Sequence, residues 1–555
     1  MVRATFSGFN TALSALQANQ KRLDITGQNL SNMNTAGYTR QQLEASSLNY
    51  TNPVSHYSNG NETAVGFGVS MDRVSQIRDP YLDIQYRSQS ADCSYTNRLQ
   101  TALNSLSKVL DETTISGIRK AFDDVQSTLT SMQDPAKVSD PIYESELRTK
   151  MQSVCNLFNQ ASRQITQAEQ NEFQRLTGEG SSEQGDVQKI NDILRQIGDL
   201  NVQIKRNQVA GHPSLELQDE RNLLLDELSG YIPVETRYYK DDAHSGNNAY
   251  DYDANGAVIG KKDWPDDLEV SMNYIDAQGK SQKLILVNGS DLGADGLTKN
   301  YGQLSVLNRD HQPAASVSDP TNISIKFEKA PSYQGNGQAA TDVYAELKGI
   351  HFEGGSLQAS LDMLQKKGTG NVINGSVDDV RGYQYYSGKL DQLASTFAKS
   401  MNASNNGNNH KDQNLLSNST DDSTNGITAG NIGISKGWTS GTIHISTDGT
   451  NRTDTILDMI AAMKDTKKLN GKTFADYMNN LSTQLASDSS SNQTALKTGT
   501  TVLNSIQDSR DSLSGVSLDE EATNMMAYVS AYNAASRLMT ALDEVLNTLI
   551  SNTGA

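Results

Sequence analysis

The chain has 555 residues, of which 35% are hydrophobic and 6% aromatic, and its formal net charge at pH 7 is −18. This length is too great for one hydrophobic core, so about two to four domains are expected. The acidity argues against nucleic acid or an anionic membrane surface as the main partner. The low hydrophobic content is unusual for an enzyme and typical of long helices joined to light β domains.

The cysteines and the N-terminal residues indicate the cellular compartment in which the chain is expected. Cys93 and Cys155 have neither a CxxC spacing nor a histidine close by in the sequence. A disulfide framework or a zinc site is therefore not expected, and both are predicted to be small buried residues. Residues 1–9 lack the apolar segment and cleavage site of a secretory signal, and no stretch reaches the roughly 18 apolar residues that span a bilayer. Taken alone, these signals predict a soluble cytoplasmic protein without membrane insertion.

The two ends of the chain predict a pair of helices. The first lies in the stretch Phe9–Arg40, where leucines recur at steps of three and seven: Leu13, Leu16, Leu23 and Leu30. The last helix, after Gly515, has a second stripe at steps of three, four and seven: Met525, Val529, Tyr532, Met539, Leu542, Leu546 and Leu549. Such spacing is typical of helices that pack along another helix, and the last helix is the more acidic. The ends are therefore predicted to pair as an antiparallel coiled coil.

The first half of the chain between the ends is predicted to be mostly helical. A turn at residues 34–38 ends the first helix, and an extended segment with hairpin-like turns at 59–60 and 66–68 follows to about Asp79. Asp79-Pro80 then opens a long helix, because proline is tolerated in the first turn. The helices of this half are predicted at about 81–110, 116–133, 141–177, 187–209 and 215–228.

The second half predicts an inserted β domain followed by more helices. Residues 231–350 are rich in Gly, Asn, Asp and Tyr, with short apolar runs such as Leu284–Val287. Helix returns at about 356–405, broken near 368–375, and again from Asp454 to the end. Residues 404–452 are predicted as a loop or a small β lobe around 441–445. Because sheet and helix are segregated, a parallel βαβ architecture is not expected.

This order predicts a mainly α fold with an inserted β domain and three structural parts. The terminal coiled-coil helices occupy residues 1–50 and 515–555. A helical middle domain comprises residues 51–230 and 351–514. A variable, β-rich outer domain comprises residues 231–350.

Three short motifs suggest chemistry, and none is complete. Gly471–Thr473 resembles the end of a phosphate-binding loop, but Thr466 stands where the opening glycine is needed. Asp251–Gly256 matches the first half of a calcium loop, but Lys262 occupies the twelfth position. Asp519–Glu521 is more simply a helix start with acids at the positive end of the dipole. The sequence therefore predicts no catalytic residue, no metal site and no cofactor.

Motifs at both ends carry a resemblance to a known family. Phe9–Leu16, with Gln28–Asn32 and Thr35–Gln41, resembles the N-terminal motif of bacterial flagellar rod, hook and hook-associated proteins. Ser514–Glu521 is similar to the signature that opens the last helix of the hook-associated protein 1 family (FlgK), the hook–filament junction proteins. Further segments similar to this family are Ile77–Leu82, Leu217–Leu228 and Leu390–Ala394.

The resemblance implies a location and a set of partners. The terminal helices would form an inner tube, the other helices a middle shell and the β insertion an outer domain. Proteins of this family leave through the flagellar type III export apparatus without a cleaved signal, so an extracellular position at the hook–filament junction replaces the cytoplasmic one. The implied partners are further copies of the chain, the hook protein, hook-associated protein 3, the flagellin side of the filament and a cytoplasmic export chaperone on the C-terminal helix.

The expected mechanism is self-assembly rather than catalysis. Head-to-tail contacts whose rotation does not close generate a helical array. Nine residues are expected to be buried against neighbouring copies: Leu13, Leu16, Leu23, Leu30, Val529, Tyr532, Met539, Leu542 and Leu546. The nearest alternative is another flagellar axial subunit, either hook or distal rod. A more remote one is a filament-borne enzyme or adhesin with its activity in residues 231–350.

Overall fold

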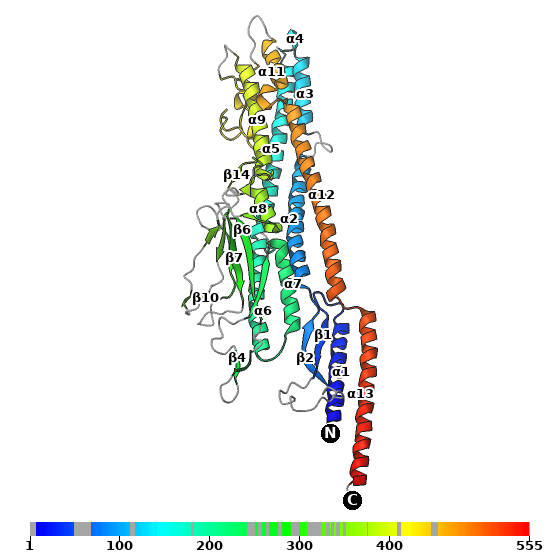
Figure 1. The fold of residues 1–555 in the computed structure, drawn as a ribbon. Coiled ribbons are helices and arrows are strands. Elements are labelled where there is room, and N and C mark those ends of the chain that lie inside the picture. The colour runs from blue at the N-terminus through cyan, green and yellow to red at the C-terminus, as the bar shows by residue number, and fades with distance from the viewer. Residues whose placement is uncertain are drawn as a thin grey trace.

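The computed structural model (Figure 1) shows an elongated molecule with both termini at one end. The structure describes residues 7–48, 68–110, 117–138, 140–178, 182–240, 250–252, 258–261, 266–275, 280–289, 299–307, 324–328, 333–334, 338–339, 345–347, 351–373, 376–407, 412–445 and 453–553. Among these residues, no helix is long and apolar enough to cross a membrane.

Long helices form the body of the molecule, which we call the rod. Its helices are α2 (Pro80–Leu110), α3 (Ile118–Ser131), α4 (Pro135–Val138), α5 (Pro141–Thr177), α6 (Asp186–Val209), α7 (Leu215–Tyr231), α8 (Gly355–Gln365), α9 (Tyr383–Asn406), α11 (Asp454–Lys464) and α12 (Phe474–Ser514). They share one hydrophobic core. At the end of the rod far from the termini, Phe122 contacts the rings of Phe397 and Phe474 at centroid distances of 5.1 and 5.5 Å. The mainly helical prediction is confirmed.

Proline and glycine explain several helix ends. Pro80 and Pro141 occupy the first positions of α2 and α5, where a missing N–H has no effect on the helix. Asp140 caps α5 by accepting a hydrogen bond from the Ile142 N–H at 2.9 Å. Gly178 ends the same helix at a φ of 76°, a conformation that favours glycine.

Antiparallel sheets pack on one side of the rod (Figure 1). The larger one contains β3 (Glu235–Lys240), β6 (Asp266–Ile275), β7 (Ser281–Asn288) and β13 (His351–Phe352), and another contains β8 (Gln303–Leu307), β9 (Ser324–Glu328) and β12 (Ala345–Leu347). Leu268, Val270 and Met272 alternate along β6 and are fully buried, so one face of the sheet joins the core. Asn201 of α6 fixes this contact by donating to the Leu268 carbonyl at 3.1 Å.

Further short strands also pair antiparallel: β4 (Tyr250–Tyr252) with β5 (Val258–Lys261), β10 (Tyr333–Gln334) with β11 (Gln338–Ala339), and β14 (Val372–Ile373) with β15 (Ser376–Val377). The incomplete calcium-loop motif begins within β4 and is followed by β5, so strands stand where an EF-hand has helices. Residues 253–257 and Lys262 of that motif, and the turns predicted at 59–60 and 66–67, lie outside the described residues. Within the part that is described, no group of His, Cys, Asp and Glu could hold a metal ion.

A small lobe follows α9, and its strands differ from the prediction. The pair is β16 (Leu416–Asn418) with β17 (Ile432–Ile434), whereas residues 441–445 form no strand and follow the short helix α10 (Lys436–Ser440). Of the two predicted possibilities, a loop or a small β lobe around 441–445, the structure has a small β lobe, but its strands lie at 416–418 and 432–434. The lobe is held by amides: Asn402 accepts from the backbone N–H groups of Leu415 and Leu416, both at 2.9 Å. Such long-range amide contacts leave no pattern in the local sequence.

The terminal part consists of α1 (Ser7–Ser31), α13 (Leu518–Thr553) and the hairpin of β1 (Gln41–Ser47) and β2 (Val69–Gln76). Figure 1 places the hairpin beside α1, and α13 along the other side of α1. The predicted boundary at residues 50/51 falls between these two paired strands.

Candidate functional site

The paired terminal helices run antiparallel, as two contacts show. The Leu542 methyl carbons lie 3.4 Å from where a Cβ on Gly8 would stand. Farther along, the Arg22 guanidinium lies over the Tyr528 ring, 5.6 Å from its centroid. Residue numbers rise along α1 as they fall along α13. The small side chains of Ala12 and Ala18, which are almost fully buried, allow neighbouring elements to approach α1 closely.

The hairpin occupies a second side of α1. The Ser14 hydroxyl accepts a hydrogen bond from the Val69 N–H at 3.2 Å. Asn29 donates to the Gln41 carbonyl and accepts from the Gln41 N–H, both at 3.0 Å. These polar contacts fix the hairpin to the helix, so α1 has one side against α13 and one against the hairpin.

The nine predicted assembly residues all lie on this helix pair. Three of them are exposed, namely Leu13 at 46%, Val529 at 43% and Tyr532 at 37%. The others are half-buried: Leu16, Leu23, Leu30, Met539, Leu542 and Leu546. The structure thus brings them together and leaves much of their surface accessible. Their burial against neighbouring copies remains a prediction.

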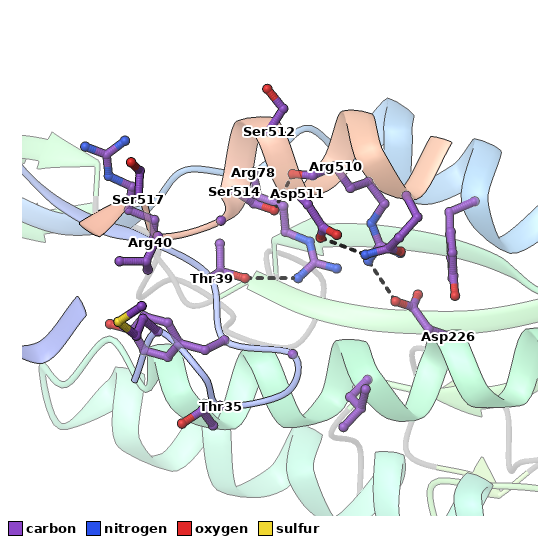
Figure 2. Close-up of a pocket in the computed structure, with 18 of the residues that line it drawn as sticks. Thr35, Thr39, Arg40, Arg78, Asp226, Arg510, Asp511, Ser512, Ser514 and Ser517 are labelled. Carbon is purple, nitrogen blue, oxygen red and sulfur yellow. Dashed lines mark hydrogen bonds and ion pairs between the residues drawn. The ribbon is translucent and has the colours of Figure 1, made fainter. Parts of the chain in front are cut away.

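A cleft of about 860 Å³ lies where the terminal helices meet the rod (Figure 2). We call this region the joint. It is lined by the segment after α1, the end of α12, the start of α13 and parts of α2 and α7. Figure 2 shows Thr39 facing Arg78 and Arg510 facing Asp226 across it. Charged side chains from distant parts of the chain therefore converge at the joint.

Arg40 connects both ends of the chain at the joint. Its guanidinium donates to Glu521 at 2.8 Å and to Glu520 at 2.7 Å, and its backbone N–H donates to the Ser514 carbonyl at 2.9 Å. The Glu521 side chain is 3% exposed and that of Arg40 19%. This mostly buried ion pair holds the first turn of α13, so the acidic triplet does more than cap a helix.

A second set of ion pairs closes the rod side of the joint. Arg510 of α12 pairs with Asp226 of α7 at 2.7 Å and with Asp83 of α2 at 3.1 Å. The same guanidinium lies 4.3 Å from the centroid of the Tyr86 ring. Asp226 also accepts from Arg87 at 2.8 Å. Three helices are thus joined by charge-assisted hydrogen bonds immediately before α13 begins.

Asp219 of α7 anchors the segment that leads away from α1. Its carboxylate accepts from the Thr39 N–H at 3.0 Å and from the Thr39 hydroxyl at 2.6 Å, and Arg78 lies 3.9 Å away. Burial raises the pKa of Asp219 to about 6, although the Thr39 hydrogen bonds and Arg78 act in the opposite direction. Ionisation of Asp219 is therefore less favourable in the folded protein than in the unfolded chain.

Lowering the pH from about 7 to 4.5 is expected to stabilise the natural chain relative to Asp219→Asn. The folded-state pKa lies above the ordinary value of 3.8, so the folded chain binds the proton first. Stability then rises as the pH falls through 6, and the gain is complete below the unfolded pKa. Asparagine does not titrate but keeps an oxygen for Thr39. Urea unfolding of both proteins across this range measures the difference, and parallel pH profiles would contradict the prediction.

The sequence did not predict the joint. Arg40 lies in one family motif, and Glu520 and Glu521 lie in another, but neither motif indicates the contact between them. They are 480 residues or more apart in the chain. The excess of basic residues near the start and of acids near the end was the available signal, but it specifies no pair.

Comparison with protein families identifies the chain. The model described as the flagellar hook-associated protein FlgK helical domain matches residues 103–416, which is more than half of the chain. The chain belongs to the FlgK family of flagellar hook-associated proteins. Two further models match the ends: the flagella basal body rod protein over residues 9–39 and the FlgEFG C-terminal model over residues 509–552. The family predicted from the terminal motifs is confirmed.

The chain is also similar to several individual proteins. Flagellar hook-associated protein 1 of Bacillus subtilis is 29% identical over 568 residues, covering 99% of both chains. The Salmonella typhimurium protein of the same name is 28% identical over 41% of this chain and 38% of its own. The solved structure of the flagellar hook junction protein FlgK from Burkholderia pseudomallei has a TM-score of 0.36 and 19% identity, covering 60% of this chain and 44% of that one.

Membership of the FlgK family gives the role of the chain. It is a structural protein of the bacterial flagellum, placed in the axial structure at the junction between hook and filament. The family is a structural one, which agrees with the prediction that the chain is not an enzyme. The sites that matter are therefore contact surfaces, of which the paired terminal helices and the joint are the candidates.

Proposed function

We propose that α1 and α13 form the inner layer of a ring of subunits, with the rod as a middle shell and the β-rich residues 231–350 as an outer domain. The observation that supports this most directly is the accessible apolar surface of the terminal pair. Leu13, Val529 and Tyr532 are exposed there. Burying such residues against neighbouring copies would stabilise the ring by about 25 cal/mol for each Å² of apolar surface removed from water.

The partners we propose follow the axial position. Besides further copies of itself, the chain would contact the hook protein below, and hook-associated protein 3 and the flagellin side of the filament above. It would reach this place as an unfolded chain through the flagellar type III export apparatus, without a cleaved signal, after a cytoplasmic chaperone has bound the C-terminal helix. Apolar residues of α13 are exposed, such as Met526 at 65%, and this supports the proposal that a chaperone covers the helix before assembly.

Removal of the gene from the cell that carries it is expected to leave bare hooks, with flagellin released into the medium. A junction protein is needed only after the hook is complete, so hook assembly is unaffected. Electron microscopy of the cells and a blot of the medium for flagellin measure both results. Restoring the gene on a plasmid is the control.

The same experiment separates the alternatives. Cells without hooks would move the chain to the hook or the distal rod, the nearest alternative role. Intact filaments would contradict the junction role and would direct attention to an accessory activity in residues 231–350.

A further inference from the structure

The outer surface of α1 carries an uninterrupted seam along the helix. Its positions recur at alternating steps of four and three: Phe9, Leu13, Leu16, Gln20, Leu23, Gly27 and Leu30. This 3.5-residue period is that of a helix packing along another helix. None of the seven is charged, and from Phe9 to Leu30 the seam extends for about 32 Å along α1. We call these residues the α1 seam.

A second seam with the same period lies on α13. Its positions are Ala527, Ala531, Ala534, Leu538, Ala541 and Val545, again at steps of four and three. Leu538 is 48% and Val545 61% exposed, so the larger side chains of this seam face solvent in the single chain. Between Glu521 and Asp543 the one charged residue of α13 is Arg537. We call these six residues the α13 seam.

The two seams face opposite sides of the helix pair. Successive residues of a helix are about 100° apart, so the α1 seam lies on the flank opposite Ser14 and Asn29, which bind the hairpin. The α13 seam lies on the flank of Asn524, which lines a small cleft together with hairpin residues such as Leu43. The α1 seam therefore faces away from the hairpin and the α13 seam faces the hairpin side. Within one chain they do not meet.

We propose that the α1 seam of one copy packs against the α13 seam of the next copy in the ring. This inference rests on the proposed self-assembly and names its lateral contact. Two matching uncharged seams on opposite sides of one helix pair make a heterologous contact, which each copy repeats with the next. The leucines of one seam meet the alanines of the other, so large and small side chains alternate across the interface. Both seams continue directly from the α1–α13 contact inside the chain.

Disulfide cross-linking in isolated flagella tests this contact. Gln20→Cys replaces an exposed, uncharged position of the α1 seam without removing an apolar side chain. It is combined in one chain with Ala527→Cys, Ala534→Cys or Ala541→Cys, which cover two heptads of register. After oxidation, at least one combination is expected to give a ladder of dimers, trimers and larger oligomers. Each single-cysteine variant is expected to remain monomeric, because a heterologous contact joins two different positions.

Matched controls distinguish the possible results of the cross-linking experiment. The unmodified chain has only its two buried cysteines, Cys93 and Cys155, and should give no ladder. Lys21→Cys, exposed next to Gln20 but off the seam, should give none with the same three partners. Variants that are present in the flagellum yet give no ladder in any combination, or single variants that give dimers, would overturn the seam contact. Absence of the unmodified chain from the flagellum would instead refute the proposed function.

Discussion

Replacing Arg40 by alanine is expected to lower the free energy of unfolding by about 3 kcal/mol, because it leaves a buried carboxylate without its partner. Glu521 is only 3% exposed, and its hydrogen bond from Arg40 is 2.8 Å long. The substitution also removes the second hydrogen bond, to Glu520, at the more exposed side of the joint. The start of α13 then loses its attachment to the segment that follows α1.

Two measurements check this prediction. Urea denaturation of the purified chain gives the loss of stability, and limited proteolysis shows where the chain opens. Cleavage is expected to become faster at residues 514–518, where α12 passes into α13. The matched control is Arg73→Ala, since Arg73 also pairs with a glutamate, Glu44, but its side chain is 71% exposed. Exposed pairs contribute little to stability, so equal losses in both variants would refute the role given to Arg40.

The sequence predicted the helices of the rod well because their signals are local. Pro80 and Pro141 mark first turns, and their helices start at these residues. The apolar run Leu284–Val287 lies within β7, as a short run of β-prone apolar residues bounded by turn residues predicts. Both cysteines are buried and free, as expected of small residues inside helices.

Local sequence signals did not predict the contacts between distant segments. The small lobe is held by Asn402 and other amides, and an asparagine inside a helix gives no indication of which backbone it binds. The sequence predicted a loop or a small β lobe around 441–445, because a short Thr/Ile run resembles a strand even where a helix and turn precede it, but the strands of the lobe lie elsewhere. Similarly, the stripes of α1 and α13 predicted helices that pack lengthwise, but not that Arg40 would fix their joint to the rod.

In the paired terminal helices, local sequence patterns and contacts between distant segments act together. A narrow apolar stripe provides limited stability in water, so each helix depends on its neighbours. Inside the chain, α1 is covered by α13 on one side and by the hairpin on another, and the remaining flank carries Leu13, Leu16, Leu23 and Leu30. The joint sets the direction in which this flank faces, because Arg40 and Asp219 hold the segment between α1 and the hairpin. Stability at the joint is therefore also a condition for assembly.

Replacing Leu23 or Leu542 by glutamate is expected to abolish incorporation into the flagellum while the rod stays folded. Leu23 lies half-buried on the α1 flank that is proposed to meet the next copy, and Leu542 packs near Gly8 inside the pair. A carboxylate buried at either position without a partner costs several kcal/mol. Neither residue belongs to the hydrophobic core of the rod, so thermal unfolding of the rod is expected to remain unchanged.

The measurement is the amount of each variant in isolated flagella relative to the culture medium. Gln17→Glu introduces the same charge at an exposed position of α1 and is expected to be incorporated normally. Loss of both leucine variants from the flagellum, with the glutamine variant retained, places the effect on the apolar stripes rather than on added charge. If both leucine variants were incorporated as well as the natural chain, the stripes would have no part in assembly, and the contacts between copies would have to lie on the rod.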